Sequence, residues 1–235
     1  MTSARFCSFA NTGETIATLA DEIVARLNRD VTSRGNASMA VSGGTTPGPL
    51  FDLLSERDAR WDKVWITLSD ERWIMTSEDG SNEHLVRTRL LRGKAASAHF
   101  VGLKTLDAKA KDGETKTDAA VVAIPRPFTI MLLGMGDDGH TASLFPHAPE
   151  LKRTLSINDP ALVRAVVAKG AEKTDERISL TLRAILDSEW IVLLIKGAEK
   201  RTAYEAAVAE SDVAQMPVRA VLNQKAVPVD VYWSP

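Results

Sequence analysis

Short apolar segments alternate with segments of helical periodicity along most of the chain, and this alternation restricts the possible folds more than any other feature. Residues 37–41, 64–68 and 129–133 are apolar runs of strand length, each followed at once by a glycine-rich or charged segment. In residues 12–27, by contrast, apolar positions recur every three or four residues. Strands that alternate with helices pair in parallel, with helices on both faces of the sheet. We therefore expect a single Rossmann-like α/β domain over residues 1–235, with a mainly parallel sheet.

Local signals predict where further elements begin and end. Asn11 and Ser81 are suitable N-caps for helices, and Gly93 is a suitable end for the second of them. The segment 104–118 is polar and lacks an apolar period, so we expect a mobile surface loop there. Further strands are expected at residues 5–9, 99–103, 161–168, 177–180, 190–195 and 229–233, and further helices around Leu50–Leu54 and at residues 119–124, 181–187 and 199–210.

Charge and cysteine content exclude several classes of function. The 29 Lys and Arg residues and 31 Asp and Glu residues leave a net charge of −2, so no overall positive field attracts nucleic acid or an anionic membrane. Cys7 is the only cysteine, which excludes an intramolecular disulfide and fits a reducing compartment. The strongest apolar run, residues 190–195, is too short to span a bilayer. We expect a cytoplasmic protein that binds neither nucleic acid nor membrane, and that binds anions through a few placed groups.

Three polar clusters each follow an apolar strand. The carboxyl ends of parallel strands share one edge of the sheet, so residues 42–47, 70–73 and 134–140 are expected to meet there. The first cluster, Ser-Gly-Gly-Thr-Thr-Pro, can present amides and hydroxyls to a phosphate, although a tight strand-to-helix turn explains it equally well. In the second, Arg72 can hold a phosphate or carboxylate, whereas a surface ion-pair cluster is the simpler interpretation of that segment alone.

The third cluster contains the strongest candidate for a catalytic side chain. Three glycines within six residues, from Gly134 to Gly139, suit neither a helix nor a strand interior, and they wrap the chain so that Asp138 and His140 project. Histidine is the usual general base near neutral pH, and an adjacent carboxylate can orient it. Taken alone, a glycine loop with a capping aspartate remains the simpler interpretation. The histidines lack the spacing of a metal site, and Gly-x-Ser-x-Gly is absent, so we predict neither a metal nor a serine nucleophile.

Together, these clusters resemble the 6-phosphogluconolactonases. The likeness covers almost the whole chain, and the segment 134–146 matches that family's motif nearly completely. The resemblance implies a single α/β domain of the glucosamine-6-phosphate isomerase/lactonase type. It also implies hydrolysis of 6-phospho-D-glucono-1,5-lactone to 6-phospho-D-gluconate, a step of the oxidative pentose phosphate pathway, without a cofactor. The matching segments are residues 42–47, 69–73, 81–82, 134–146 and 177–181 and the pair Gly197 and Lys200.

The resemblance also assigns roles to single residues. His140 matches the catalytic histidine and Asp138 the acidic residue beside it, so His140 is expected to deprotonate the attacking water. Two differences from the family's pattern do not affect this chemistry. Asp137 stands where the family varies, and residues 76–80 lack the Asp-His-Pro type of sequence often found before Ser-Asn. The residues expected to hold the substrate are Ser42, Gly43, Gly44, Thr45, Asp70, Arg72, Asn82, Arg177 and Lys200.

Two other functions are compatible with parts of this pattern. Glucosamine-6-phosphate deaminases share the sugar-phosphate loop and Asp-Gly-His, but they resemble Asp-Glu-Tyr at residues 70–73 and carry Asn-Glu-Pro at residues 144–146, where this chain differs. A non-catalytic sugar-phosphate sensor domain could lose His140, which this chain keeps, and no DNA-binding helix-turn-helix precedes the fold. The expected partner is a small phosphorylated sugar lactone, and the expected state is a monomer or small homo-oligomer.

Overall fold

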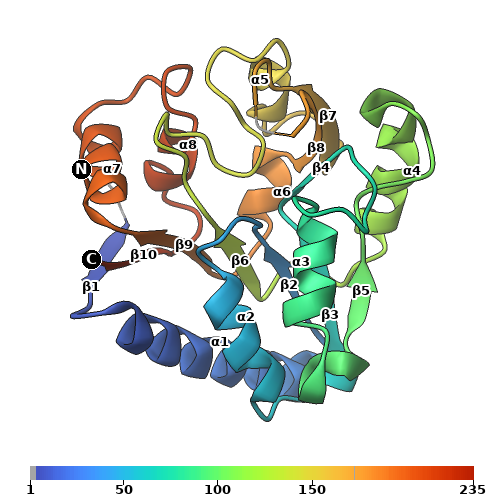
Figure 1. Cartoon of the computed structure of the whole chain (residues 1–235), viewed down its shortest axis with the longest axis vertical. Helices are drawn as coiled ribbons and strands as arrows, with labels where there is room; N and C mark the ends of the chain where they lie inside the picture. The colour runs from blue at the N-terminus through green and yellow to red at the C-terminus, as the bar shows by residue number, and fades with distance from the viewer. Residues whose placement is uncertain (1–3, 172) are drawn as a thin grey trace.

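A computed structural model of the protein describes residues 4–171 and 173–235, and its centre is a parallel sheet (Figure 1). All neighbouring strands described in this sheet run parallel, and β2 and β6 are buried along their whole length. The expected mainly parallel α/β fold is therefore confirmed. The strand order is β1 (Arg5–Ser8), β10 (Val229–Ser234), β9 (Ile191–Lys196), β6 (Ile130–Leu133), β2 (Ala37–Val41), β3 (Val64–Leu68) and β5 (His99–Val101).

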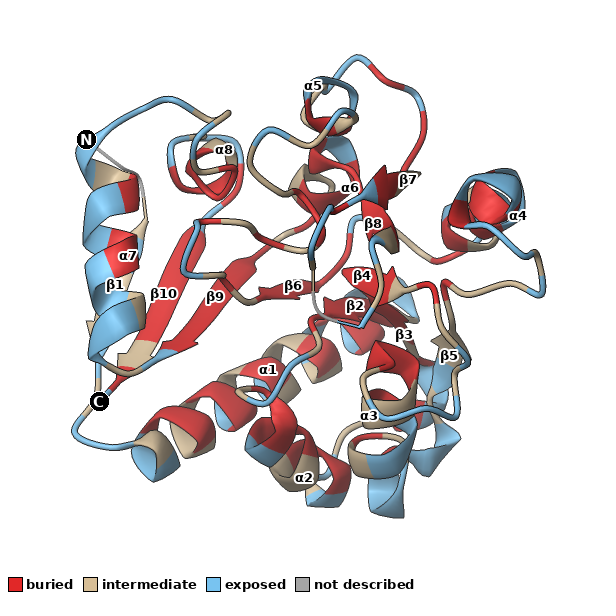
Figure 2. Ribbon diagram, turned by 45° about the horizontal axis from the view of Figure 1, so that its top comes forward, coloured by how far each residue is buried: buried red, intermediate tan, exposed pale blue. Residues whose placement is uncertain are grey.

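Helices cover both faces of this sheet (Figure 2). The longest, α1, begins where the Asn11 side chain accepts a hydrogen bond from the amide of Glu14, and it ends at Gly35 with a φ of 80°. Its buried stripe includes Ile16, Leu19, Ile23 and Leu27, which is the helical spacing that the sequence shows. On one face lie α1 (Thr12–Arg34), α2 (Gly48–Glu56) and α3 (Asn82–Arg89), and on the other α6 (Leu182–Leu186), α7 (Ala198–Ala209) and α8 (Arg219–Leu222).

A second, antiparallel sheet stands beside the carboxyl edge of the main one. It contains β4 (Asp70–Arg72), β8 (Glu176–Leu180) and β7 (Val163–Val167). The chain passes directly from β3 into β4 through Ser69, whose amide bonds to Val41 and whose carbonyl accepts from Leu180. The strands expected at residues 161–168 and 177–180 exist, but they belong to this small sheet, which forms a wall above the rim of the parallel strands.

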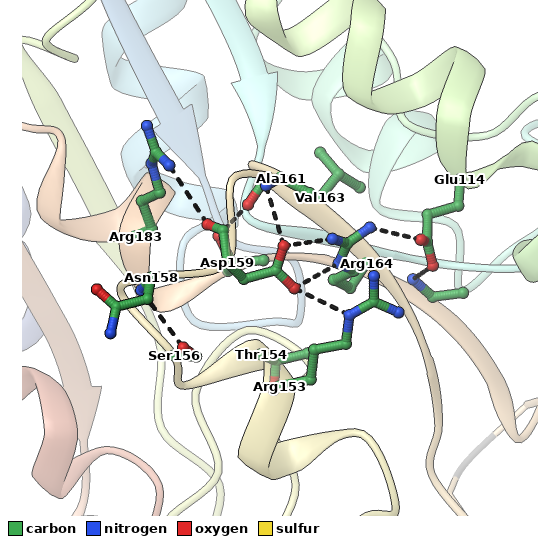
Figure 3. A network of polar contacts seen from close by, with 12 residues as sticks. Glu114, Arg153, Thr154, Ser156, Asn158, Asp159, Ala161, Val163, Arg164 and Arg183 are labelled. Atoms are coloured by element: carbon green, nitrogen blue, oxygen red, sulfur yellow. Dashed lines mark hydrogen bonds and ion pairs between the residues drawn. The ribbon is translucent and has the colours of Figure 1, made fainter.

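The prediction of a mobile loop at residues 104–118 is wrong, because most of that segment belongs to helix α4 (Ala110–Val122). The helix expected at residues 119–124 is the end of the same element. Its buried positions have helical spacing but are mostly small or polar, so hydrophobic periodicity could not reveal them. The Thr117 hydroxyl donates to the carbonyl of Leu103, and Glu114 pairs with Arg164 (Figure 3). The buried positions are Ala110, Gly113, Glu114, Thr117 and Val121.

A few boundaries also differ from expectation. Ser81 caps α3 as predicted, by accepting from the amide of His84, but α3 ends at Arg89 and Gly93 instead opens a 3₁₀ turn, η2 (Gly93–Ser97). The helix ends earlier because the amides of Leu90 and Leu91 both bond to the carbonyl of Val86. The short elements α5 (Leu151–Thr154), α8 and η1 (Trp61–Lys63) were not expected, since three or four residues are too few to show a period. Within the described residues, no helix is both long and apolar enough to cross a bilayer.

Candidate active site

The three polar clusters meet in one cavity of about 290 Å³ at the carboxyl edge of the main sheet. They follow β6, β2 and β3, which are neighbours in the sheet. The prediction that the clusters share one rim is therefore confirmed. Every residue expected to hold the substrate lines the cavity: Ser42, Gly43, Gly44, Thr45, Asp70, Arg72, Asn82, Arg177 and Lys200, together with His140. Asp138 does not line it but contacts His140 directly.

The His140 ring is held by a carboxylate and an aromatic ring. Its Nδ1 lies 2.6 Å from Oδ1 of Asp138, which also accepts the backbone N–H of His140 at 3.0 Å. The other support is Phe145, whose ring stacks on the imidazole with centroids 4.2 Å apart. Because an ionised carboxylate only accepts, Nδ1 carries the proton of a neutral imidazole and Nε2 presents its lone pair. Among the described residues, Nε2 has no hydrogen-bond partner.

The charge of Asp138 is maintained by its contact with His140. Burial raises the pKa of the Asp138 carboxyl, but the hydrogen bonds from the ring and backbone of His140 outweigh it and leave the pKa below its usual value. Asp138 is thus a carboxylate at neutral pH, able to stabilise an imidazolium. This is the arrangement that a general base requires of its orienting group.

The loop that carries His140 needs its glycines and contains backbone strain. A Cβ at Gly136 would lie 2.1 Å from Nδ1 of His140, and Gly139 has a φ of 76° against the side chain of Met216. Ala142 also has a positive φ, 49°, which is unfavourable for a residue with a side chain. Thr141 ties the loop back by donating from its hydroxyl to the carbonyl of Gly134. The strain therefore lies directly beside the candidate base.

The loop at residues 42–47 connects β2 to α2 and forms the opposite side of the cavity. Gly44 has a φ of 86°, and a Cβ on Gly43 would lie 1.7 Å from the side-chain oxygen of Asn82. Glycine is thus required at Gly43 by close packing and at Gly44 by conformation. The amides of such a turn at a helix start can bind an anion.

Asp70 and Asn82 make hydrogen bonds that hold the wall of the cavity together. The Asp70 carboxylate accepts hydrogen bonds from the hydroxyls of Ser143 at 2.5 Å and Ser69 at 3.1 Å. The side-chain nitrogen Nδ2 of Asn82 donates to the backbone carbonyl of Asp70 at 2.8 Å. This bond holds the side-chain oxygen of Asn82 against Gly43. These contacts join the ends of β2 and β3 to the loop after His140. Substrate contact by either residue remains a prediction.

Glu71 supports the site in a way that the sequence did not reveal. It is fully buried, and burial raises the pKa of its carboxyl despite four hydrogen bonds to it. The only sequence signal was an acidic residue inside the charged segment 70–73, which is also typical of a surface ion-pair cluster. Through these bonds Glu71 holds the start of α3 against β4. The donors are the hydroxyl of Ser81 and the backbone amides of Arg72, Asn82 and Glu83, at 2.7–2.9 Å.

The cavity has a surplus of positive charge. Four cationic side chains line it, namely Arg72, Arg177, Lys196 and Lys200, against the single carboxylate of Asp70. Lys196 was missed by sequence reasoning, although its place at the end of the apolar run 190–195 signals the same rim. Such a surplus suits a ligand with a phosphate group. Within the described residues, no group of three or more His, Cys, Asp or Glu could hold a metal ion.

Nearly the whole chain is similar to proteins of one family. A family described as glucosamine-6-phosphate isomerases/6-phosphogluconolactonase matches residues 10–233. A 6-phosphogluconolactonase of Mesorhizobium japonicum is 42% identical over 97% of this chain and 94% of its own. The crystal structure of a 6-phosphogluconolactonase from Shewanella baltica is 43% identical, with a TM-score of 0.96 over 99% of this chain and 98% of its own. A monomeric glucosamine-6-phosphate deaminase, 16% identical with a TM-score of 0.76 over 98% of this chain and 97% of its own, shares the fold.

Proposed function

The chain belongs to the glucosamine-6-phosphate isomerase/6-phosphogluconolactonase family, and we propose that it hydrolyses 6-phospho-D-glucono-1,5-lactone to 6-phospho-D-gluconate, with His140 as the general base. This reaction would place it in the oxidative pentose phosphate pathway. One observation carries the proposal: a carboxylate-oriented histidine faces a cavity with a surplus of cationic side chains. The cations suit a phosphorylated ligand, and the histidine suits hydrolysis of an ester without a covalent intermediate.

The geometry supports a direct attack by water. Nε2 of His140 takes a proton from a water molecule while the water oxygen bonds to C1 of the lactone. The tetrahedral oxyanion then collapses, the C1–O5 bond breaks, and the imidazolium returns its proton to O5. The carboxylic acid so formed loses a proton to solvent. Asp138, 2.6 Å from Nδ1, stabilises the imidazolium between these two steps.

The remaining residues position the substrate for this attack. The phosphate is the one strongly anionic group of the lactone, and the cations and loop amides of the cavity suit it. Holding the phosphate fixes the ring relative to Nε2, so that binding away from the reacting atoms lowers the barrier. Phe145 keeps the imidazole plane in place by stacking at 4.2 Å.

The deaminase alternative is less well supported. This chain has Arg72-Trp73 within residues 70–73, where deaminases resemble Asp-Glu-Tyr, and Leu144-Phe145-Pro146 where they carry Asn-Glu-Pro. Arg72 and Phe145 both line the cavity. Trp73 is buried and donates from its ring nitrogen to the carbonyl of Asp107, and Phe145 stacks on His140. The structural likeness to a deaminase at 16% identity concerns the fold alone.

The proposal also includes the cellular location of the protein and its oligomeric state. A cytoplasmic location is supported by the single cysteine, Cys7, which is free, and cell fractionation would test it. A monomer or small homo-oligomer is expected, and analytical ultracentrifugation would measure it.

The function is tested with freshly generated substrate. The phospholactone opens spontaneously, so acid release is followed with and without the protein. We expect acid release to be clearly faster than the spontaneous rate, and no ammonia release from glucosamine 6-phosphate. An unchanged rate of lactone opening, or ammonia release at a comparable rate, would overturn the assignment.

A further inference from the structure

One cation of the cavity is already paired with a carboxylate outside it. Nζ of Lys200 lies 2.7 Å from Oδ1 of Asp137. Lys200 stands in the first turn of α7 and lines the cavity, whereas Asp137 belongs to the glycine loop and does not line it. The Asp137 side chain is 73% exposed. The pair therefore sits at the rim, between the loop that carries His140 and the start of α7.

The proposed reaction changes the charge of the ligand. The lactone carries only its phosphate, about −2 at neutral pH, whereas the product carries a new carboxylate as well, about −3. A cavity with four cations and one carboxylate therefore attracts the product more strongly than the substrate. An enzyme with such a cavity is prone to inhibition by its own product unless some of the positive charge is offset.

We propose that Asp137 is a counter-charge to Lys200 that lowers the affinity of the cavity for the more highly charged product. The inference rests on the proposed function, because it depends on the extra carboxylate of a hydrolysed lactone. Asp137 touches no reacting atom here; it acts through Lys200. An exposed ion pair contributes little to stability, so replacing Asp137 leaves the fold intact.

The test compares two neutralising substitutions in the same region. Asp137→Asn removes the carboxylate charge while keeping the side-chain size. Glu199→Gln is the matched control: Glu199 is exposed, precedes Lys200 in α7, and makes no ion pair with any residue that the structure describes. Binding of 6-phosphogluconate is measured by calorimetry, and its inhibition of lactone hydrolysis by steady-state kinetics.

We expect Asp137→Asn to lower the Kd and Ki of the product by about 5- to 10-fold. The KM of the lactone should fall less, by about 3- to 5-fold, because the lactone carries two charges against three. Glu199→Gln should change each constant by less than about 2-fold. The effect of Asp137→Asn should shrink at 0.5 M salt, since exposed charges are screened.

Two results would overturn the proposal. Equal effects of the two substitutions would show that the Lys200 contact has no special role. Unchanged or weaker product binding in Asp137→Asn would show that Asp137 does not limit affinity, and weaker binding would instead assign it to positioning Lys200 for the ligand. Failure of the wild-type protein to open the lactone is a separate outcome, which removes the proposed function itself.

Discussion

The charged network beside α4 (Figure 3) and the cavity at the sheet edge contain the same types of side chain but differ in how their charges are compensated. In the network, Arg164 pairs with both Glu114 and Asp159, and Asp159 also accepts from Arg153. The side chains of Arg164 and Asp159 are only 12% and 7% exposed. The cavity is lined by four cations and by the carboxylate of Asp70, and Lys200 also pairs with Asp137 at the rim.

This difference separates a structural cluster from a binding site. A buried network whose charges are matched inside the protein holds α4 against β7, and removal of one partner leaves a buried charge without compensation. At the cavity wall, cations outnumber the carboxylates that line the cavity, and an anionic ligand can compensate this difference. Residue type alone does not distinguish the two. We therefore expect substitutions in the network to lower stability, and substitutions in the cavity to lower binding or turnover.

The largest expected effect is on catalysis, at His140. His140→Ala should lower kcat by about 100- to 10,000-fold, the usual range for a lost general base. Affinity for 6-phosphogluconate should change far less, because the cationic side chains remain. Turnover and product binding are measured on a variant whose folding is checked by circular dichroism. A folded variant that binds product normally and turns over near the wild-type rate would contradict the mechanism.

Replacing an arginine by methionine should mainly lower stability in the network and mainly raise KM in the cavity. Arg164→Met leaves Glu114 and Asp159 buried without their shared partner, and should lower the free energy of unfolding by about 3 kcal/mol. The KM of the folded variant should stay near the wild-type value. Urea unfolding and steady-state kinetics measure the two quantities.

Arg72→Met is the matched control in the cavity. It should raise KM by about 10-fold, equivalent to one lost charge-assisted contact, and lower the free energy of unfolding by less than about 1 kcal/mol. If both variants lost mainly stability, the distinction between the two regions would fail.

The smallest expected effect is the acid sensitivity of the network. The hydrogen bond from Arg164 is the main reason that the pKa of Asp159 falls from 3.8 to about 2. A carboxyl whose pKa is lower in the folded state stabilises that state at any pH above its pKa in the unfolded state. This stabilisation, about 2 kcal/mol, is lost as the pH falls from about 4 to 2. About half of it should be lost by pH 3. Urea unfolding at pH 6 and pH 3 measures the total loss of stability, which should be smaller by about 1 kcal/mol in Asp159→Asn than in the wild type. An equal loss in that variant would assign the acid sensitivity to other carboxylates.

The site was predictable because its residues follow strands directly. Residues 42–47, 70–73 and 134–140 each come at the end of an apolar run, and parallel pairing brings such ends to one edge whatever the details of packing. The pairing of Asp138 with His140 could also be predicted, since the two residues are only two positions apart. Local spacing and one topological rule were sufficient for these features.

Other parts of the site required long-range contacts. Glu71 bonds to residues about ten positions away in α3, and Lys200 meets Asp137 from a different element. The buried positions of α4 are polar at Glu114 and Thr117, and they are buried only because Arg164 and the carbonyl of Leu103 satisfy them. A pattern based on hydrophobicity assigns such residues to solvent.

The strands of the main sheet, their parallel pairing and the rim at which the three clusters meet could all be predicted from the amino-acid sequence. These follow from period, turn residues and strand ends, which are local properties of the chain. Which charged residues compensate one another, and which line a cavity where a ligand can bind, became clear from the folded structure and could not be predicted from the sequence. The reason is electrostatic: the effect of a charge depends on its neighbours in space and on its burial, and both arise from segments distant in the chain.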